Sequence, residues 1–147
     1  MADMTNIKFL YPPNFEGTYP EGTPNGHRKY IVQCTNISDG SGEHDAIKLK
    51  RTDLLTADGN IASKLVIEKV EYDVSGMMVE ISYDNMNDEV AAMLQNSSGC
   101  LDFTKHGGFV PQTDDSDIPG GGNIIFNTGG GSLGDTYNII LTVRVKD

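Results

Sequence analysis

The segment 135–146 reads DTYNIILTVRVK and gives the clearest strand pattern in the chain. Apolar side chains recur at every second position of its second half, and polar side chains lie mostly between them, with Ile140 as the exception. A period of two is typical of a strand that buries one face and exposes the other. We therefore predict a strand whose inward face carries Ile139, Leu141, Val143 and Val145.

Shorter strand candidates precede this segment along the chain. They cover residues 30–35, 46–49, 64–73, 77–83 and 123–127. Turn signals rich in glycine separate them, for example SDGSG at 38–42. Because Ser75-Gly76 separates the strands at 64–73 and 77–83, the sequence predicts a β-hairpin there. Segment 87–96 fits either a short helix or a strand, and its composition does not decide between them.

Short strands, frequent turns and the absence of long helical patterns are typical of all-β domains. The chain holds 17 glycines among 147 residues, above the average usage of about 7%. Its length suits one domain. We predict a single antiparallel β-sandwich, or a jelly-roll-like barrel, over residues 28–147.

Residues 1–27 differ from the rest because prolines and glycines interrupt them repeatedly. Proline fixes φ and removes a backbone donor, so we predict an extended N-terminal arm. Several large apolar side chains lie within this arm. It therefore either packs on its own domain or docks on a partner, where aromatic side chains make effective anchors. The residues predicted to bind a partner are Phe9, Leu10, Tyr11, Phe15 and Tyr19.

The net charge of −10 limits the classes of partner. An acidic surface repels phosphate backbones and anionic lipids, so we expect no nucleic acid and no membrane among the partners. The N-terminus is polar and does not resemble a signal peptide, and no apolar run approaches the ~20 residues that span a bilayer. We expect synthesis in a reducing cytosol. A free, buried thiol is therefore favoured for Cys34, although a disulfide with Cys100 stays open.

No motif in the chain predicts catalysis, a cofactor or a metal. Gly129, Gly131 and Gly134 match G-x-G-x-x-G, but a strand pattern follows where a nucleotide site needs a helix. These glycines indicate a tight turn. The three histidines lie far apart in the sequence, so we expect no catalytic residues. Acidic clusters at 84–89 and 114–117 fit solvated loops, with an irregular calcium site as the alternative.

Several segments together resemble one group of viral proteins. They are TNISDGSGE at 35–43, VEYDVSGM at 70–77, VEISYD at 79–84, GCLDF at 99–103, GNIIF at 122–126 and GDTYNIIL at 134–141. Over residues 28–147 the chain resembles small virion structural proteins of marine tailed phages, including those of cyanobacteria. The resemblance implies a capsid decoration (cement) protein on the outer surface of the mature phage head. Such a protein binds the major capsid protein, commonly as a homotrimer, and stabilises the shell.

Two other functions stay open on the sequence alone. The chain could be a β module of a phage tail, neck or fibre that binds host-surface glycans. It could also be a β-sandwich enzyme, although the resemblance supplies no catalytic residues. As a decoration protein or as a glycan-binding module, the protein is a virion component that acts by binding rather than by chemistry.

Overall fold

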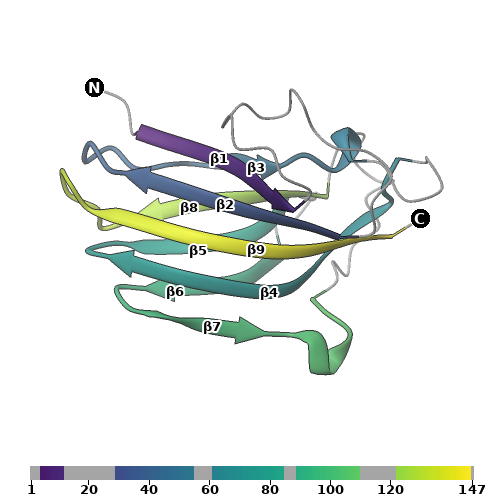
Figure 1. Ribbon diagram of the computed structural model, residues 1–147. Helices are drawn as coiled ribbons and strands as arrows, with labels where there is room; N and C mark the ends of the chain where they lie inside the picture. Colours follow the sequence, from purple (N-terminus) through teal and green to yellow (C-terminus); the bar gives the residue numbers. More distant parts are fainter. Residues whose placement is uncertain (1–3, 12–28, 55–60, 85–88, 110–121, 147) are drawn as a thin grey trace.

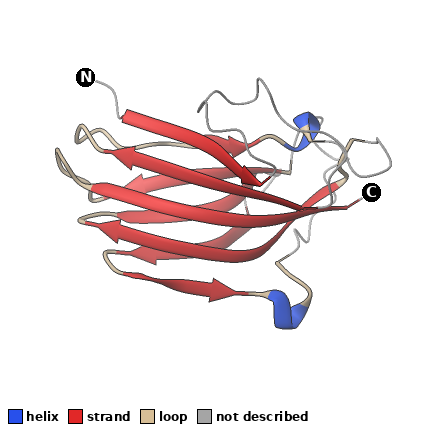
Figure 2. Ribbon diagram, in the orientation of Figure 1, coloured by secondary structure: helices blue, strands red, loops and turns tan. Residues whose placement is uncertain are grey.

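The computed structural model describes residues 4–11, 29–54, 61–84, 89–109 and 122–146. These residues form two antiparallel sheets that pack face to face (Figure 1). The strands are β1 (Met4–Tyr11), β2 (Lys29–Ile37), β3 (Ala46–Leu49), β4 (Lys64–Ser75), β5 (Met78–Asp84), β6 (Glu89–Gln95), β7 (Ser98–Asp102), β8 (Asn123–Gly129) and β9 (Thr136–Lys146). Helical structure in the described residues is limited to two short 3-10 turns, at 51–53 and 104–106 (Figure 2).

One sheet has the strand order β1-β2-β9-β4-β7 and the other has the order β3-β8-β5-β6. This arrangement confirms the predicted all-β class and antiparallel β-sandwich. The described strands do not close into a barrel. None of the described helical segments has the length and apolar character that crossing a bilayer requires.

Strand β9 lies at the centre of the five-stranded sheet, between β2 and β4. Its predicted inward face is confirmed, because Ile139, Leu141 and Val143 are fully buried and Val145 nearly so. The alternation of apolar and polar residues in the sequence therefore identified the strand that pairs with a neighbouring strand on each side. Buried side chains of β2 and β4 extend the same core on either flank.

The predicted hairpin between the strands at 64–73 and 77–83 is wrong. Strand β4 belongs to the five-stranded sheet, whereas β5 belongs to the four-stranded sheet. The chain crosses between the sheets at Gly76, whose φ of +83° suits glycine. Val74 and Met77 are both buried on either side of it. A short glycine turn suits this crossing as well as a hairpin. Segment 87–96, which fits a helix or a strand by composition, forms strand β6 (Glu89–Gln95).

The first part of the predicted arm is a strand of the domain. Strand β1 pairs antiparallel with β2 along its length, which corrects the predicted boundary between residues 27 and 28 for this segment. Phe9 is only 2% exposed, and its ring meets that of Tyr30 edge-on at 5.9 Å. Residues 12–28 lie outside the described part of the chain. Residues 4–11 of the predicted arm therefore pack on the protein's own domain, which is one of the two predicted alternatives.

Both cysteines are free, Cys34 in the core and Cys100 on the exposed edge strand β7. Burial, partly offset by the positive charge of Lys48, raises the pKa of the Cys34 thiol to about 12. Since the thiolate is the reactive form, Cys34 should be inert in the folded protein.

We expect a thiol reagent to label one cysteine per chain under native conditions and two in denaturant. The reason is that only Cys100 combines exposure with a free thiol. Native labelling should vanish in Cys100→Ser and persist in Cys34→Ser, as counted by absorbance of the released chromophore. Rapid native labelling of the Cys100→Ser variant would contradict the burial of Cys34.

Candidate functional site

A cluster of polar side chains lies inside the sandwich, at the margin formed by β2, β3 and β9. We call it the Glu43–Lys48–Tyr137 cluster. The side chains of Glu43 and Lys48 are 8% and 3% exposed, and Tyr137 is 1% exposed. Charged side chains are rarely buried to this extent unless they are paired. The cluster is therefore the feature of the described core that most needs an explanation.

Lys48 enters the interior because β3 is irregular at this residue. Ile47 pairs with Ile125 of β8 and Leu49 with Ile124, so Lys48 is an extra residue between two regular pairs. Such a bulge redirects the side chains around it. The amine of Lys48 lies 5.5 Å from the ring centroid of Phe126, where the ring face attracts a cation.

The hydrogen bonds within the cluster form a chain. Nζ of Lys48 lies 2.5 Å from Oε2 of Glu43, and the hydroxyl of Tyr137 donates to Oε1 of the same carboxylate. The ring of Tyr137 is 5.9 Å from Nζ of Lys48. Burial and then the negative charge of Glu43 raise the pKa of Tyr137, so its hydroxyl keeps its proton and acts as a donor. Each oxygen of the Glu43 carboxylate thus has its own partner.

The loop between β2 and β3 holds Glu43 against the core. Its backbone N–H donates to Oγ1 of Thr128 at 2.7 Å, and its carbonyl accepts from the N–H of Thr128 at 3.0 Å. Asp45 has a left-handed backbone, with φ of 50°, and its N–H donates to Oδ1 of Asn127. A non-glycine residue in this region costs about 1 kcal/mol or more, so the surrounding contacts must hold the turn in place. This turn brings Glu43 and Lys48 together.

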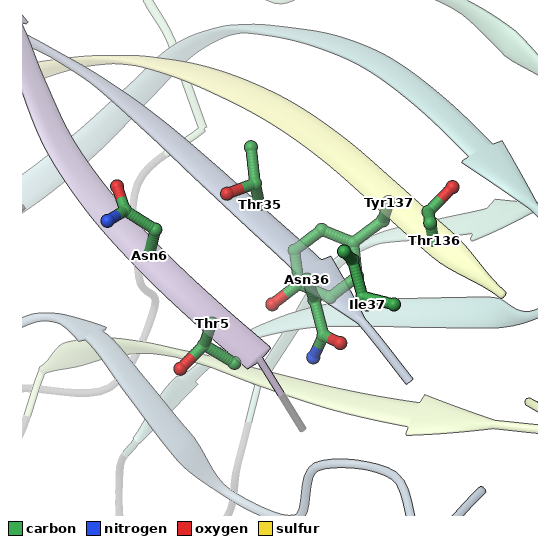
Figure 3. A pocket seen from close by; sticks show the side chains of 7 residues that line it. All are labelled: Thr5, Asn6, Thr35, Asn36, Ile37, Thr136 and Tyr137. Atoms are coloured by element: carbon green, nitrogen blue, oxygen red, sulfur yellow. The ribbon is translucent and has the colours of Figure 1, made fainter. Parts of the chain in front are cut away.

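A shallow hollow of about 400 Å³ opens near the end of the sheet where β1 and β9 begin and β2 ends (Figure 3). None of its lining residues is charged, although the chain as a whole is strongly acidic. Most of them carry a hydroxyl or a carboxamide. They are Thr5, Asn6, Thr35, Asn36, Ile37, Thr136 and Tyr137.

The residues predicted to bind a partner occupy different environments. Phe9 belongs to the domain's own core, which corrects its predicted role as an anchor. Leu10 is half-buried, and Tyr11 is 51% exposed. Phe15 and Tyr19 lie outside the described residues. Among the described residues of this set, Leu10 and Tyr11 therefore lie at a surface, at the end of the edge strand β1.

A bulge in β1 sets the direction of Tyr11. Phe9 pairs with Val32, which faces the core, whereas Tyr11 pairs with Ile31, which faces outward. In a regular strand residues 9 and 11 would share one face. The extra residue at Leu10 turns Tyr11 to the outer face of the five-stranded sheet.

The glycine motif at 129–134 is a tight turn, as predicted. Gly129 ends β8, the chain turns through Gly130 and Gly134 with positive φ, and β9 follows at Thr136. In the described residues no group of three or more His, Cys, Asp or Glu side chains could hold a metal ion. The cluster at 114–117 and residues 85–88 lie outside that part of the chain, so the calcium alternative stays untested there.

Comparison with protein-family models, with curated proteins and with solved structures finds no significant match for this chain. Function must therefore be argued from the residues themselves. Sequence reasoning missed the Glu43–Lys48–Tyr137 cluster. The only available signal was a lysine inside the short strand AIKL at 46–49, which would ordinarily be assigned to the exposed face.

Proposed function

We propose that the protein is a non-catalytic capsid decoration protein of a tailed phage. It binds the major capsid protein on the outside of the mature head, as a homotrimer, and stabilises the shell. The sequence resemblance over residues 28–147 supports this proposal. The observation on which its contact surface rests is the exposed end of β1, where the bulge at Leu10 turns Tyr11 outward.

Strand β1 offers two kinds of contact at this place. It is an edge strand, because β2 is its partner in the five-stranded sheet and it has no described neighbour on its other side. Edge strands present backbone N–H and C=O groups to which another chain can add a strand. Tyr11 adds a large amphipathic side chain beside that edge, and tyrosine is enriched where binding energy concentrates.

A stiff domain with a small contact surface suits a protein of which many copies bind to one capsid. Each contact alone can be weak, because three contacts within one trimer raise the effective concentration of the others. The charge of −10 keeps decorated particles dispersed, since like-charged surfaces repel. Decoration requires neither catalysis nor a cofactor.

Tyr11→Ala is expected to weaken binding to mature, undecorated heads by at least about tenfold, the equivalent of ~1.4 kcal/mol. Co-sedimentation with mature heads measures the affinity, and unexpanded proheads serve as the negative control. The matched variant is Ile37→Ala. Ile37 is 47% exposed and faces outward at the opposite end of the β1–β2 pair, so its variant should bind normally. Binding of the parent protein to neither head form contradicts the decoration function.

The hollow of Figure 3 favours a second candidate, a virion module that binds host-surface glycans. Its uncharged hydroxyl and carboxamide side chains suit a neutral, hydroxyl-rich ligand, and Ile37 supplies apolar contact. The same pair of variants separates the candidates. If heads are not bound, and if Ile37→Ala but not Tyr11→Ala abolishes binding to a glycan array, the second function replaces the first.

A further inference from the structure

The buried pair of Glu43 and Lys48 has the geometry of two groups poised to react. We propose that the two side chains condense spontaneously into an amide, with loss of one water molecule. The product joins Cδ of Glu43 to Nζ of Lys48. This modification is independent of the proposed partner, because every participating atom lies inside one chain.

The contact distance supports the reaction. Nζ of Lys48 lies 2.5 Å from Oε2 of Glu43, so the nucleophile already touches the group that it attacks. Holding two reactants in contact replaces a bimolecular encounter with an effectively unimolecular step. The left-handed turn at Asp45 and the hydrogen bonds from the loop to Asn127 and Thr128 maintain this contact in the folded state.

Burial also favours the product. In water the separated ions are favoured over the amide at equilibrium, because hydration stabilises both charges. Glu43 and Lys48 are 8% and 3% exposed and have lost most of that hydration. Burying two charges carries a large desolvation cost that their mutual attraction repays only in part. Conversion into a neutral amide removes both charges and releases a water molecule to the solvent.

Tyr137 is the catalytic residue of this reaction. Its hydroxyl donates to Oε1 of Glu43, the oxygen on which negative charge develops when the amine adds to Cδ. A donor placed at a developing oxyanion in a water-poor site stabilises the transition state strongly. The raised pKa of Tyr137 keeps the proton on this donor.

The steps balance without any other reactant. The Lys48 ammonium first passes one proton to Oε2 of Glu43, which leaves a neutral amine beside a neutral carboxyl. The amine nitrogen then attacks Cδ, and the electron pair of the Cδ–Oε1 double bond moves to Oε1. A second proton passes from the nitrogen to Oε2, the Cδ–Oε2 bond breaks, and water leaves as the carbonyl reforms.

Mass spectrometry of the denatured, full-length protein tests the proposal directly. The expected mass is lower than that of the sequence by one water. Trypsin should then fail to cleave after Lys48, so that residues 30–50 stay together in one peptide, and fragmentation should join Glu43 to Lys48. Lys48→Arg keeps the positive charge and lacks the primary amine, so this variant should have its full sequence mass.

The exposed pair of Lys69 and Glu71 is an internal control. Its Nζ and Oε1 atoms are 3.8 Å apart, and the two side chains are 41% and 50% exposed. Because water hydrates both charges there, cleavage after Lys69 should be complete. Tyr137→Phe, checked for folding by circular dichroism, should form the amide about 10²-fold more slowly than the parent.

Two results overturn the proposal. One is a full sequence mass, with complete cleavage after Lys48, in folded parent protein after prolonged incubation. The other is a one-water loss that persists in Lys48→Arg, since this loss would then arise elsewhere, for example in a succinimide at Asp39-Gly40. Amide formation at the parental rate in Tyr137→Phe would remove Tyr137 from the reaction.

Discussion

Replacing Phe9 with alanine is expected to lower the free energy of unfolding by about 3–5 kcal/mol. Phe9 is 2% exposed and packs edge-on against Tyr30, so the truncation removes apolar contacts and leaves a cavity beneath β1. A close-packed protein interior relaxes only in part around such a cavity. Urea denaturation followed by circular dichroism measures the change.

Tyr11→Ala is the matched control for this measurement. It truncates an aromatic side chain two residues away, but Tyr11 is 51% exposed. Its effect on stability should stay within about 0.5 kcal/mol, which is usual for surface substitutions. Equal, small losses for both variants would mean that β1 does not pack on the sheet in solution. The arm would then follow the other alternative that its sequence leaves open, in which it docks on a partner.

Replacing Lys48 with methionine is expected to destabilise the fold by about 3–5 kcal/mol. The substitution leaves the buried carboxylate of Glu43 with the Tyr137 hydroxyl but without the cation that touches its other oxygen. A buried charge without a partner destabilises the fold far more than the replacement of both charged residues by apolar ones. The expectation holds for the ion pair and for the amide alike, because either way the variant retains a buried carboxylate.

The double variant Glu43→Leu/Lys48→Met should recover most of this loss. Apolar replacement of a buried pair often stabilises by about 1–4 kcal/mol. Here the Tyr137 hydroxyl loses its acceptor, at a cost of about 1–3 kcal/mol, so the two effects nearly cancel. Lys69→Met breaks the exposed pair with Glu71 and should change stability by less than about 1 kcal/mol. Equal losses in the single and double variants would contradict a role for charge burial.

The sequence predicted those features that depend on local pattern. The alternation in 135–146 identified β9 and its buried face. In one sheet of a sandwich, successive side chains of a strand point alternately into the core and to the outer face, so every second residue is buried. The pairing of β4 and β5 could not be predicted in the same way. A short turn at Gly76 serves a hairpin and a crossing between sheets equally well, and only the packing of both sheets decides between them.

The misassignment of Phe9 has a similar cause. The first proline is Pro12, so residues 4–11 carry none of the proline and glycine signals that suggest an arm, and only their closeness to residues 12–27 places them in it. The Glu43–Lys48–Tyr137 cluster was even harder to predict from the sequence. A lysine side chain is stable in a core only when it forms an ion pair with a specific partner there. The contact between Lys48 and Glu43 depends on a bulge in β3 and on a left-handed turn at Asp45, and neither feature has a strong sequence signal.

The central place of β9 in the five-stranded sheet has a consequence for the order of events during synthesis. Strands β1 and β2 on one side, and β4 and β7 on the other, are joined only through β9, which comes after every other described strand along the chain. Residues 136–146 must therefore be synthesised before this sheet can form completely. Until then β2 and β4 each present an unpaired edge to the solvent, the kind of edge on which aggregation begins. Because this sheet is completed by contacts between residues distant in sequence, we expect it to form more slowly than the local turns.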